Sequence, residues 1–376
     1  MTALALPPRP RVLVVALRRL GDVLLTTPLI RSVKRAFPDA AIDALVFAGT
    51  EGILAGNPDL SAVLTVPQRP SMGETLALTL RLFKRYDLAL STQTGDRPTL
   101  LAVIAGRHSA GPRDGHGVGA AVKGALLTRS YVSDRGRHRL LDILKLAEVL
   151  GIPALAEVVA PAGGARAAAA PAQVYAVIHA APMFVYKRWT RDGWRSLAAG
   201  LRERGLGTVV TGAATDRAYL DEVWRDADVV RLDGKLGWPD LAALIADARI
   251  YIGPDTAVTH LAAACGTPTV ALYGPTDPRL WGPWPRGGLE EAWAAAGTIQ
   301  RRGNVWLVQN PLPCLPCQLE GCERRLDSHS QCLDELSVGQ VVAAVDAALQ
   351  GETDDANCHP ARDRILLRHG ESPATG

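Results

Sequence analysis

The sequence has 376 residues, of which 48% are hydrophobic and 21% charged, with a formal net charge of +3 at pH 7. This length is typical of two domains, and the composition excludes an intrinsically disordered chain. The sequence has no run of roughly eighteen apolar residues, which excludes a membrane-spanning helix. The first residues, MTALALPPRPR, lack the apolar segment of a secretory signal, so we expect a cytoplasmic protein.

Basic residues crowd the first half of the chain. A GC-rich genome explains the excess of arginine over lysine, but it does not explain this clustering. A basic first domain would attract an anionic acceptor or an anionic membrane surface. Aromatic residues make up 5% of the chain and do not alternate with the charges, so we expect no nucleic-acid partner. The clustered residues are Arg9, Arg11, Arg18, Arg19, Arg31, Lys34, Arg35, Arg129, Arg135, Arg137, His138 and Arg139.

In the first half, strands alternate with helices. Continuous apolar runs indicate strands that are buried on both faces, and 3.6-residue spacing indicates helices. We expect Pro28 to kink the first helix and Pro38 to end it. This alternation predicts a doubly wound parallel sheet. The predicted strands are 11–17, 41–47, 62–66 and 86–90, and the predicted helices are 22–37, 75–84 and 140–150. Residues 100–105 are expected to pack after the fourth strand, with no element type assigned.

The second half repeats the scheme after a segment rich in Pro, Gly and Ala. We predict a first domain at 1–160, a linker at 161–172, a second domain at 173–350 and a mobile polar tail at 351–376. Two consecutive Rossmann-like domains with one crevice between them are therefore the expected α/β architecture. The predicted strands are 174–179, 208–211, 229–232, 251–253 and 270–273, and the helices are 191–204, 216–224, 238–248, 256–265 and 338–349.

Residues 251–284 are the most informative stretch. We predict that Pro254 stops strand pairing, that Asp255 caps the following helix and that Gly266 ends it. Two strand ends then lie side by side, where ligands bind in open parallel sheets. A helix N-terminus at this point would suit a phosphate group.

Five motifs, in order, resemble those of the ADP-heptose:lipopolysaccharide heptosyltransferases, glycosyltransferase family 9. The resemblance runs from about residue 11 to 349, and the first fifty residues look most like the heptosyltransferase III type. The motifs are LGDVLLTTP at 20–28, KRW at 187–189, GPDTA at 253–257, HLAAA at 260–264 and YGPTDP at 273–278.

The resemblance implies a GT-B fold and an inverting transfer that needs no cofactor. It implies that the first domain binds a lipid A-core acceptor at the inner membrane surface and that the second binds ADP-heptose. The protein would then move heptose to the inner core of lipopolysaccharide, at or near the inner face of the inner membrane. The oligomeric state is not predicted.

The resemblance also gives candidate residues for the transfer. Asp22 is the candidate base for the acceptor hydroxyl, and its alternative reading is a helix N-cap. Lys187 is placed on the donor phosphates, and its alternative reading is a solvated surface lysine. Arg18, Arg19 and Gly21 are the candidate acceptor-binding residues.

Donor binding is assigned to the second domain. His260 lies one helical turn beyond Thr256 and on the same face, with a purely structural histidine as the alternative. Two departures from relatives weaken the nucleotide assignment: Ala180 and Ala181 replace a hydroxyl residue and an arginine, and Ala214 replaces an acid, with Asp216 two places on. The candidate donor-binding residues are Asp255, Thr256, Ala257, His260, Thr276 and Gly212.

Four late cysteines form the pattern C-x2-C-x4-C-x9-C. In a reducing compartment this pattern favours a structural zinc site over disulfides. Reduced, partly buried thiols are the alternative, because the second and third spacings are irregular for a zinc ribbon. These residues are Cys314, Cys317, Cys322 and Cys332.

Three other functions compete with heptose transfer. A family 9 transferase could use another nucleotide sugar for another surface glycan. A nicotinamide-dependent oxidoreductase is disfavoured, because the first strand is followed by Arg18-Arg19-Leu20-Gly21 and not by G-x-G-x-x-G. The third alternative is a binding module without catalytic activity.

Overall fold

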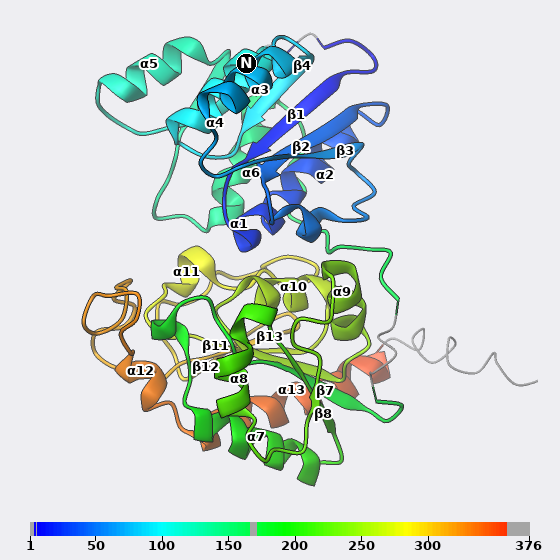
Figure 1. Cartoon of the computed structure of the whole chain (residues 1–376), viewed down its shortest axis with the longest axis vertical. Coiled ribbons are helices and arrows are strands. Elements are labelled where there is room, and N and C mark those ends of the chain that lie inside the picture. Colours follow the sequence, from blue (N-terminus) through cyan, green and yellow to red (C-terminus); the bar gives the residue numbers. More distant parts are fainter. Residues whose placement is uncertain (1–3, 5, 166–170, 359–376) are drawn as a thin grey trace, which may run out of the picture.

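The computed structural model describes residues 4, 6–165 and 171–358, and its strands form two separate sheets (Figure 1). The strands of the first sheet all pair in parallel, in the order β3-β2-β1-β4-β5-β6. They are β1 (Arg11–Ala16), β2 (Ala41–Phe47), β3 (Ala62–Val66), β4 (Tyr86–Ser91), β5 (Gly106–Arg113) and β6 (Arg129–Val132).

The second sheet has the order β12-β13-β11-β10-β7-β8-β9. Its pairs are parallel except that β12 runs antiparallel to β13 at one edge. The doubly wound architecture that we predicted is therefore confirmed in both halves. The strands are β7 (Tyr175–His179), β8 (Gly207–Thr211), β9 (Val230–Arg231), β10 (Ile250–Pro254), β11 (Thr269–Leu272), β12 (Ile299–Arg302) and β13 (Val305–Val308).

Helices cover both sheets (Figure 1). Those of the first half are α1 (Leu20–Leu24), α2 (Thr27–Ala36), α3 (Met72–Leu82), α4 (Asp96–Ala105), α5 (Val118–Leu126) and α6 (Arg139–Leu150), with a 3-10 turn, η1 (Glu51–Leu54). Those of the second half are α7 (Arg191–Glu203), α8 (Arg217–Val223), α9 (Trp238–Ala246), α10 (Ala257–Cys265), α11 (Pro278–Trp281), α12 (Gln331–Asp334) and α13 (Val338–Cys358), with 3-10 turns η2 (Val185–Lys187) and η3 (Ala214–Asp216).

Three predicted boundaries are wrong. Residues 22–37 do not form one kinked helix, because α1 ends at Leu24 and Pro28 occupies the first turn of α2, where proline is well tolerated. Pro254 does not stop pairing, since it lies within β10 opposite Leu272. The last helix continues to Cys358, so residues 351–358 of the predicted tail are helical; the rest of that tail and residues 166–170 of the predicted linker lie outside the described residues.

The two halves meet along α1 and α10 (Figure 1). Nε2 of His138 donates a hydrogen bond to the carbonyl oxygen of Gly282 at 2.9 Å, and Nε1 of Trp284 donates to the carbonyl oxygen of Ala156 at 2.7 Å. One buried apolar cluster includes side chains from both halves, among them Val23 and Val258. Within the described residues, no helix is both long enough and apolar enough to cross a bilayer.

Candidate functional site

The site lies where α1 and α10 face each other, at the carboxyl ends of β1 and β10. A Cβ atom on Gly21 would lie 3.7 Å from Cα of Ala257 and 3.8 Å from Cδ2 of His260, which is ordinary van der Waals contact. The first turns of these two helices therefore pack directly on each other. Residues from both halves of the chain meet at this point.

Asp22 is the third residue of α1, and the N-cap position belongs to Arg19. Asp22 is therefore not the helix cap that we considered as an alternative. Its Oδ1 lies 3.2 Å from Nε of Arg18 and 3.9 Å from Nε of Arg139. Two guanidinium groups of the first half thus lie beside this carboxylate.

Arg139 was not among the residues predicted for the site. It is the first residue of α6, and it donates to the carbonyl oxygen of Thr92 and lies 3.5 Å from Asp142. Its Nε has no hydrogen-bond partner among the described residues. Burial lowers the pKa of Arg139, and the Asp22 carboxylate opposes that effect. The sequence places Arg139 in a basic cluster, but nothing in that cluster points to Asp22.

Asp255 lies at the centre of the residues that the second half contributes to the site. Its Oδ2 accepts hydrogen bonds from Nζ of Lys187 and from Oγ1 of Thr276, the latter at 2.7 Å. Burial tends to raise the pKa of Asp255, but the charges of Lys187 and His260 and the two hydrogen bonds together lower it below its ordinary value. Lys187 is therefore not the solvated surface lysine of the alternative reading.

Asp255 does not cap α10, so that prediction is wrong. The cap is Thr256, whose hydroxyl accepts from the backbone N–H of Thr259 at 3.4 Å, and the helix begins at Ala257, one residue later than predicted. The carboxylate of Asp255 is consequently free to bind Lys187. The C-terminal end is as expected, because Gly266 adopts the left-handed conformation at φ 83°.

His260 lies between the charged groups of the two halves. Its side chain is buried, and its Nδ1 has no hydrogen-bond partner in the described part of the chain. Burial lowers its pKa, while the carboxylates of Asp255 and Asp22 oppose that effect and Lys187 adds to it. A buried ring nitrogen with no protein partner can serve a ligand, in addition to any packing role.

The remaining predicted acceptor residues lie beside this site. Arg18 is partly exposed and bonded to Asp22. The guanidinium of Arg19 lies 4.7 Å from the ring centre of Phe184, which stacks on Tyr186. Arg19 therefore bridges from the first half to the loop that follows β7.

The differences from relatives that the sequence indicated lie in the loops after β7 and β8. Ala180 is buried and offers no side-chain donor. A Cβ atom on Gly212 would lie 2.4 Å from Cδ1 of Leu220, so a larger residue in this turn would have to displace the end of that side chain. The carboxylate of Asp216 accepts from the backbone N–H of Ala213 at 3.1 Å and closes its own turn. Within the described residues, none of these makes a hydrogen bond to the carboxylate of Asp22 or Asp255.

The four late cysteines are free thiols. Cys332 is buried, and burial together with the neighbouring Cys317, Cys322 and Cys314 raises the pKa of its thiol to about 12. The described residues contain no group of three or more His, Cys, Asp or Glu side chains placed to hold a metal ion. The described arrangement therefore gives no support to the structural zinc site that the cysteine spacing suggested.

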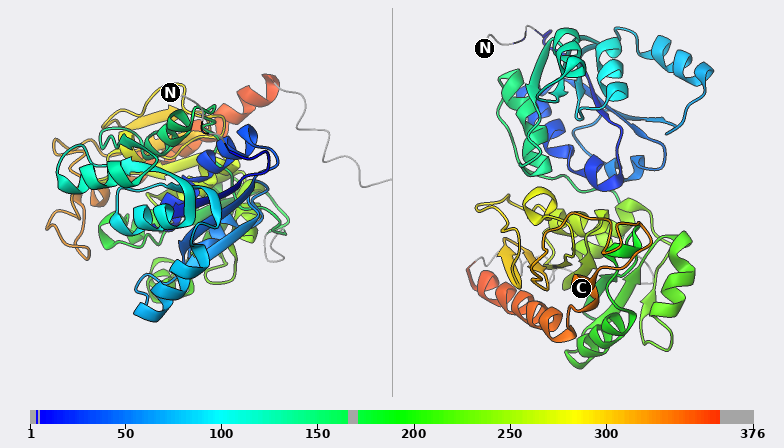
Figure 2. Two further views of the ribbon diagram at one scale, coloured as in Figure 1. Left: turned by 90° about the horizontal axis from the view of Figure 1, so that it is seen from above. Right: turned by 90° about the vertical axis from the view of Figure 1, so that its left-hand side faces the viewer.

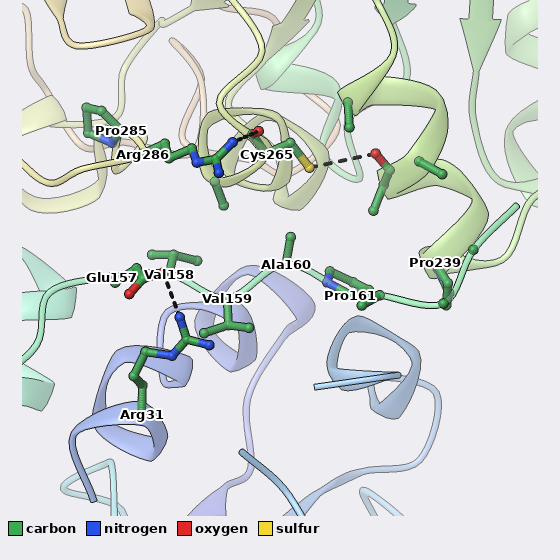
Figure 3. A pocket seen from close by; sticks show the side chains of 17 residues that line it. Arg31, Glu157, Val158, Val159, Ala160, Pro161, Pro239, Cys265, Pro285 and Arg286 are labelled. Atoms are coloured by element: carbon green, nitrogen blue, oxygen red, sulfur yellow. Dashed lines mark hydrogen bonds and ion pairs between the residues drawn. The ribbon is translucent and has the colours of Figure 1, made fainter. Parts of the chain in front are cut away.

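A separate cavity of about 370 Å³ lies between the halves, at the opposite end of α10 (Figure 3). Residues 157–164 cross it, with Arg31 on one side and Cys265 and Arg286 on the other. Arg31 is already paired with Asp59 and Glu157. The cavity is thus distinct from the group around Asp22 and Asp255.

The chain is similar to proteins of one known family. Residues 75–288 match the model of glycosyltransferase family 9 (heptosyltransferase). The chain is 30% identical over 284 residues to lipopolysaccharide heptosyltransferase 3 of Escherichia coli, covering 70% of this chain and 83% of that protein.

Solved structures agree on the fold. E. coli ADP-heptose heptosyltransferase II superposes with a TM-score of 0.70 at 19% identity, covering 91% of this chain and 99% of that one. An E. coli heptosyltransferase solved with ADP gives a TM-score of 0.68 at 22% identity, covering 90% and 99%. These structures confirm the expected GT-B fold. From the matched motifs and the similarity along its length, the chain belongs to glycosyltransferase family 9, the heptosyltransferases.

Proposed function

We propose that this transferase moves heptose from ADP-heptose to the inner core of lipopolysaccharide. One observation carries the proposal: the Asp22 carboxylate of the first half and the Lys187, Asp255 and His260 group of the second lie on either side of the α1–α10 contact. The donor and the acceptor are supported by the names of similar proteins, among them lipopolysaccharide heptosyltransferase 3 and an ADP-heptose heptosyltransferase II.

In this proposal the first domain, 1–160, binds the acceptor, and the second, 173–350, binds the donor. Asp22 takes the proton of the acceptor hydroxyl, and Arg18 and Arg139 orient its carboxylate. The hydroxyl oxygen forms a bond to the anomeric carbon from the face opposite the diphosphate. The bond from that carbon to the diphosphate oxygen breaks, so the configuration inverts and ADP leaves with the electron pair.

Negative charge grows on the leaving diphosphate. The side chain of Lys187 and the first backbone N–H groups of α10, at Ala257 and beyond, are the proposed counter-charges. Lys187 would exchange its contact with Asp255 for a contact with a phosphate oxygen. The Asp255 carboxylate could then accept a hydrogen bond from a heptose hydroxyl. His260 would use its unpartnered Nδ1 toward the donor, and Thr276 and Gly212 would border it.

Asp22→Asn tests the assignment of the base. The amide keeps the shape of the side chain but cannot take a proton, so transfer should fall by about 10²–10⁴-fold. Binding of ADP, measured by calorimetry, should stay unchanged. Asp96→Asn, at an exposed acid that pairs with Lys123, is the matched control and should keep full activity. Turnover of the Asp22→Asn protein near that of the control would reject Asp22 as the base.

A second nucleotide sugar remains an alternative donor, because Ala180 and Ala214 supply no side-chain hydrogen bond where relatives carry polar residues. Product mass after incubation with ADP-heptose and with hexose nucleotides separates the two. Transfer from a hexose nucleotide alone would replace the proposal. We further propose a cytoplasmic protein that meets its lipid A-core acceptor at the inner face of the inner membrane.

A further inference from the structure

Helix α3 has two apolar faces. Leu82 is buried in the core of the first sheet, and Leu78 packs against the same cluster. These two residues fix the helix to the domain. Four other apolar side chains point away from it and form what we name the outer stripe: Met72, Leu76, Leu80 and Phe83, which are 91%, 60%, 70% and 66% exposed.

The outer stripe is continuous along the helix. At about 100° per residue, Met72, Leu76 and Leu80 fall within roughly 80° of the circumference, away from Leu78 and Leu82. Phe83 is the C-cap residue that follows the helix. Figure 2 shows α3 projecting from the first half of the molecule, away from the second sheet. Single exposed leucines are ordinary, but a contiguous apolar stripe on a projecting helix indicates an interaction surface.

The charges around the outer stripe are mainly positive. Residues 67–85 contain four basic residues and one acidic residue. The acid, Glu74, is bonded to the hydroxyl and the backbone N–H of Ser71 in a capping box at the start of α3. In the described part of the chain, no ion pair involves Arg69, Arg81 or Arg85. Their guanidinium groups are therefore not paired with a carboxylate of the described chain.

We propose that the outer stripe of α3 docks on the surface of an anionic phospholipid bilayer. The apolar side chains would enter the boundary between headgroups and acyl chains, while Arg69, Arg81 and Arg85 contact lipid phosphates. Apolar residues on one helical face with basic residues at both helix ends are typical of interfacial helices. The inference deepens the proposed function, because it names the surface through which the enzyme reaches a lipid-linked acceptor.

Vesicle sedimentation with the full chain tests the surface. Vesicles of phosphatidylglycerol and phosphatidylethanolamine should bind the protein, and pure phosphatidylcholine should bind it at least about tenfold more weakly. The variant Leu76→Gln/Leu80→Gln/Phe83→Gln should bind the anionic vesicles at least about tenfold more weakly. Its circular dichroism should match the parent, because glutamine is a good helix former.

Two further variants sharpen the test. Arg69→Gln/Arg81→Gln/Arg85→Gln should lose most of the preference for anionic vesicles. Val118→Thr/Val122→Thr, on the exposed face of α5, removes apolar surface from another helix of the same half and should bind vesicles like the parent. Full binding by the α3 glutamine variant, or an equal loss in the α5 variant, would overturn the proposal.

Two other readouts separate membrane docking from the proposed transferase function and from dimer formation. With a delipidated, water-soluble core oligosaccharide, the α3 glutamine variant should transfer sugar at the parent rate. If the parent transfers no heptose but its vesicle binding still depends on the outer stripe, the proposed function fails and the docking surface stands. If the parent is a dimer in light scattering that the variant converts to monomers, and the parent binds no vesicles, the stripe joins two copies and the proposal is wrong.

Discussion

Replacing Lys187 with methionine measures how much the Lys187–Asp255 ion pair stabilises the second half of the chain. The two side chains are only 19% and 9% exposed, so solvent screens the pair weakly. Removing one partner of a buried pair costs about 3–5 kcal/mol, because the other charge stays buried and uncompensated. The remaining hydrogen bond from Thr276 to Asp255 offsets part of this cost. We therefore expect the free energy of unfolding to fall by about 3 kcal/mol.

The chain carries a natural probe for this measurement. All eight tryptophans lie in the range from Trp189 to Trp306, so tryptophan fluorescence in urea follows mainly the second half, with Trp284 at its contact with the first half. With a slope of about 2 kcal/mol per molar urea, the midpoint should fall by about 1.5 M. Lys235→Met is the matched control, because Lys235 is exposed and bonds only a backbone carbonyl. It should change the free energy of unfolding by less than about 0.5 kcal/mol.

A double-mutant cycle isolates the pair. With Asp255→Asn added, the loss should be smaller than the sum of the single losses by about 1–3 kcal/mol. The acid side gives an independent check. Because the pKa of Asp255 is lowered on folding, the pair stabilises the protein above the unfolded carboxyl pKa and this contribution is lost as the pH falls through the folded value. A midpoint shift no larger than that of Lys235→Met would refute the reasoning.

Two further predictions concern the helix start and the contact between the halves. Thr256→Ala removes the cap of α10 and should lower the free energy of unfolding by about 1 kcal/mol in the same fluorescence assay, whereas Thr256→Ser should keep it. Burial lowers the pKa of His138 to about 4, although its bond to the Gly282 carbonyl opposes the shift. The unfolded chain then binds more protons, so stability falls between pH 6.5 and about 4. In acid unfolding, His138→Asn should remove part of this loss of stability, on the order of 1–3 kcal/mol. An unchanged loss of stability between pH 6.5 and about 4 would contradict this prediction.

The sequence predicted the elements whose apolar pattern is strong. Strand β1 and the later strands β7 and β10 are continuous apolar runs, and all were expected close to their observed positions. Strand β5 was missed because its sequence, GRHSAGPR, has no apolar run. It is nevertheless held between β4 and β6 by backbone pairing, which depends on residues far along the chain. Tertiary context decides such strands, and local propensity does not.

The sequence identified most of the residues at the site, but it did not predict all the contacts between them. Lys187, Asp255 and Thr276 were named in advance, and the structure brings them together, although their roles stay predictions. Arg139 was missed as a partner of Asp22 because no local pattern joins residues in different elements so far apart. The cap of α10 was assigned one residue early, since Asp and Thr are both good caps and the sequence does not show which one is extended.

The charges of the site are balanced within each half before the halves meet. Asp22 lies beside Arg18 and Arg139 of the first half, and Asp255 beside Lys187 of the second. Bringing α1 against α10 therefore buries no unpaired carboxylate, which would otherwise oppose the contact. His260 lies near the charges of both halves, and burial lowers its pKa although the carboxylates of Asp255 and Asp22 oppose that shift. It follows that neutralising Asp22 should leave the Lys187–Asp255 pair intact, so loss of transfer with unchanged ADP binding would report on the proton acceptor alone.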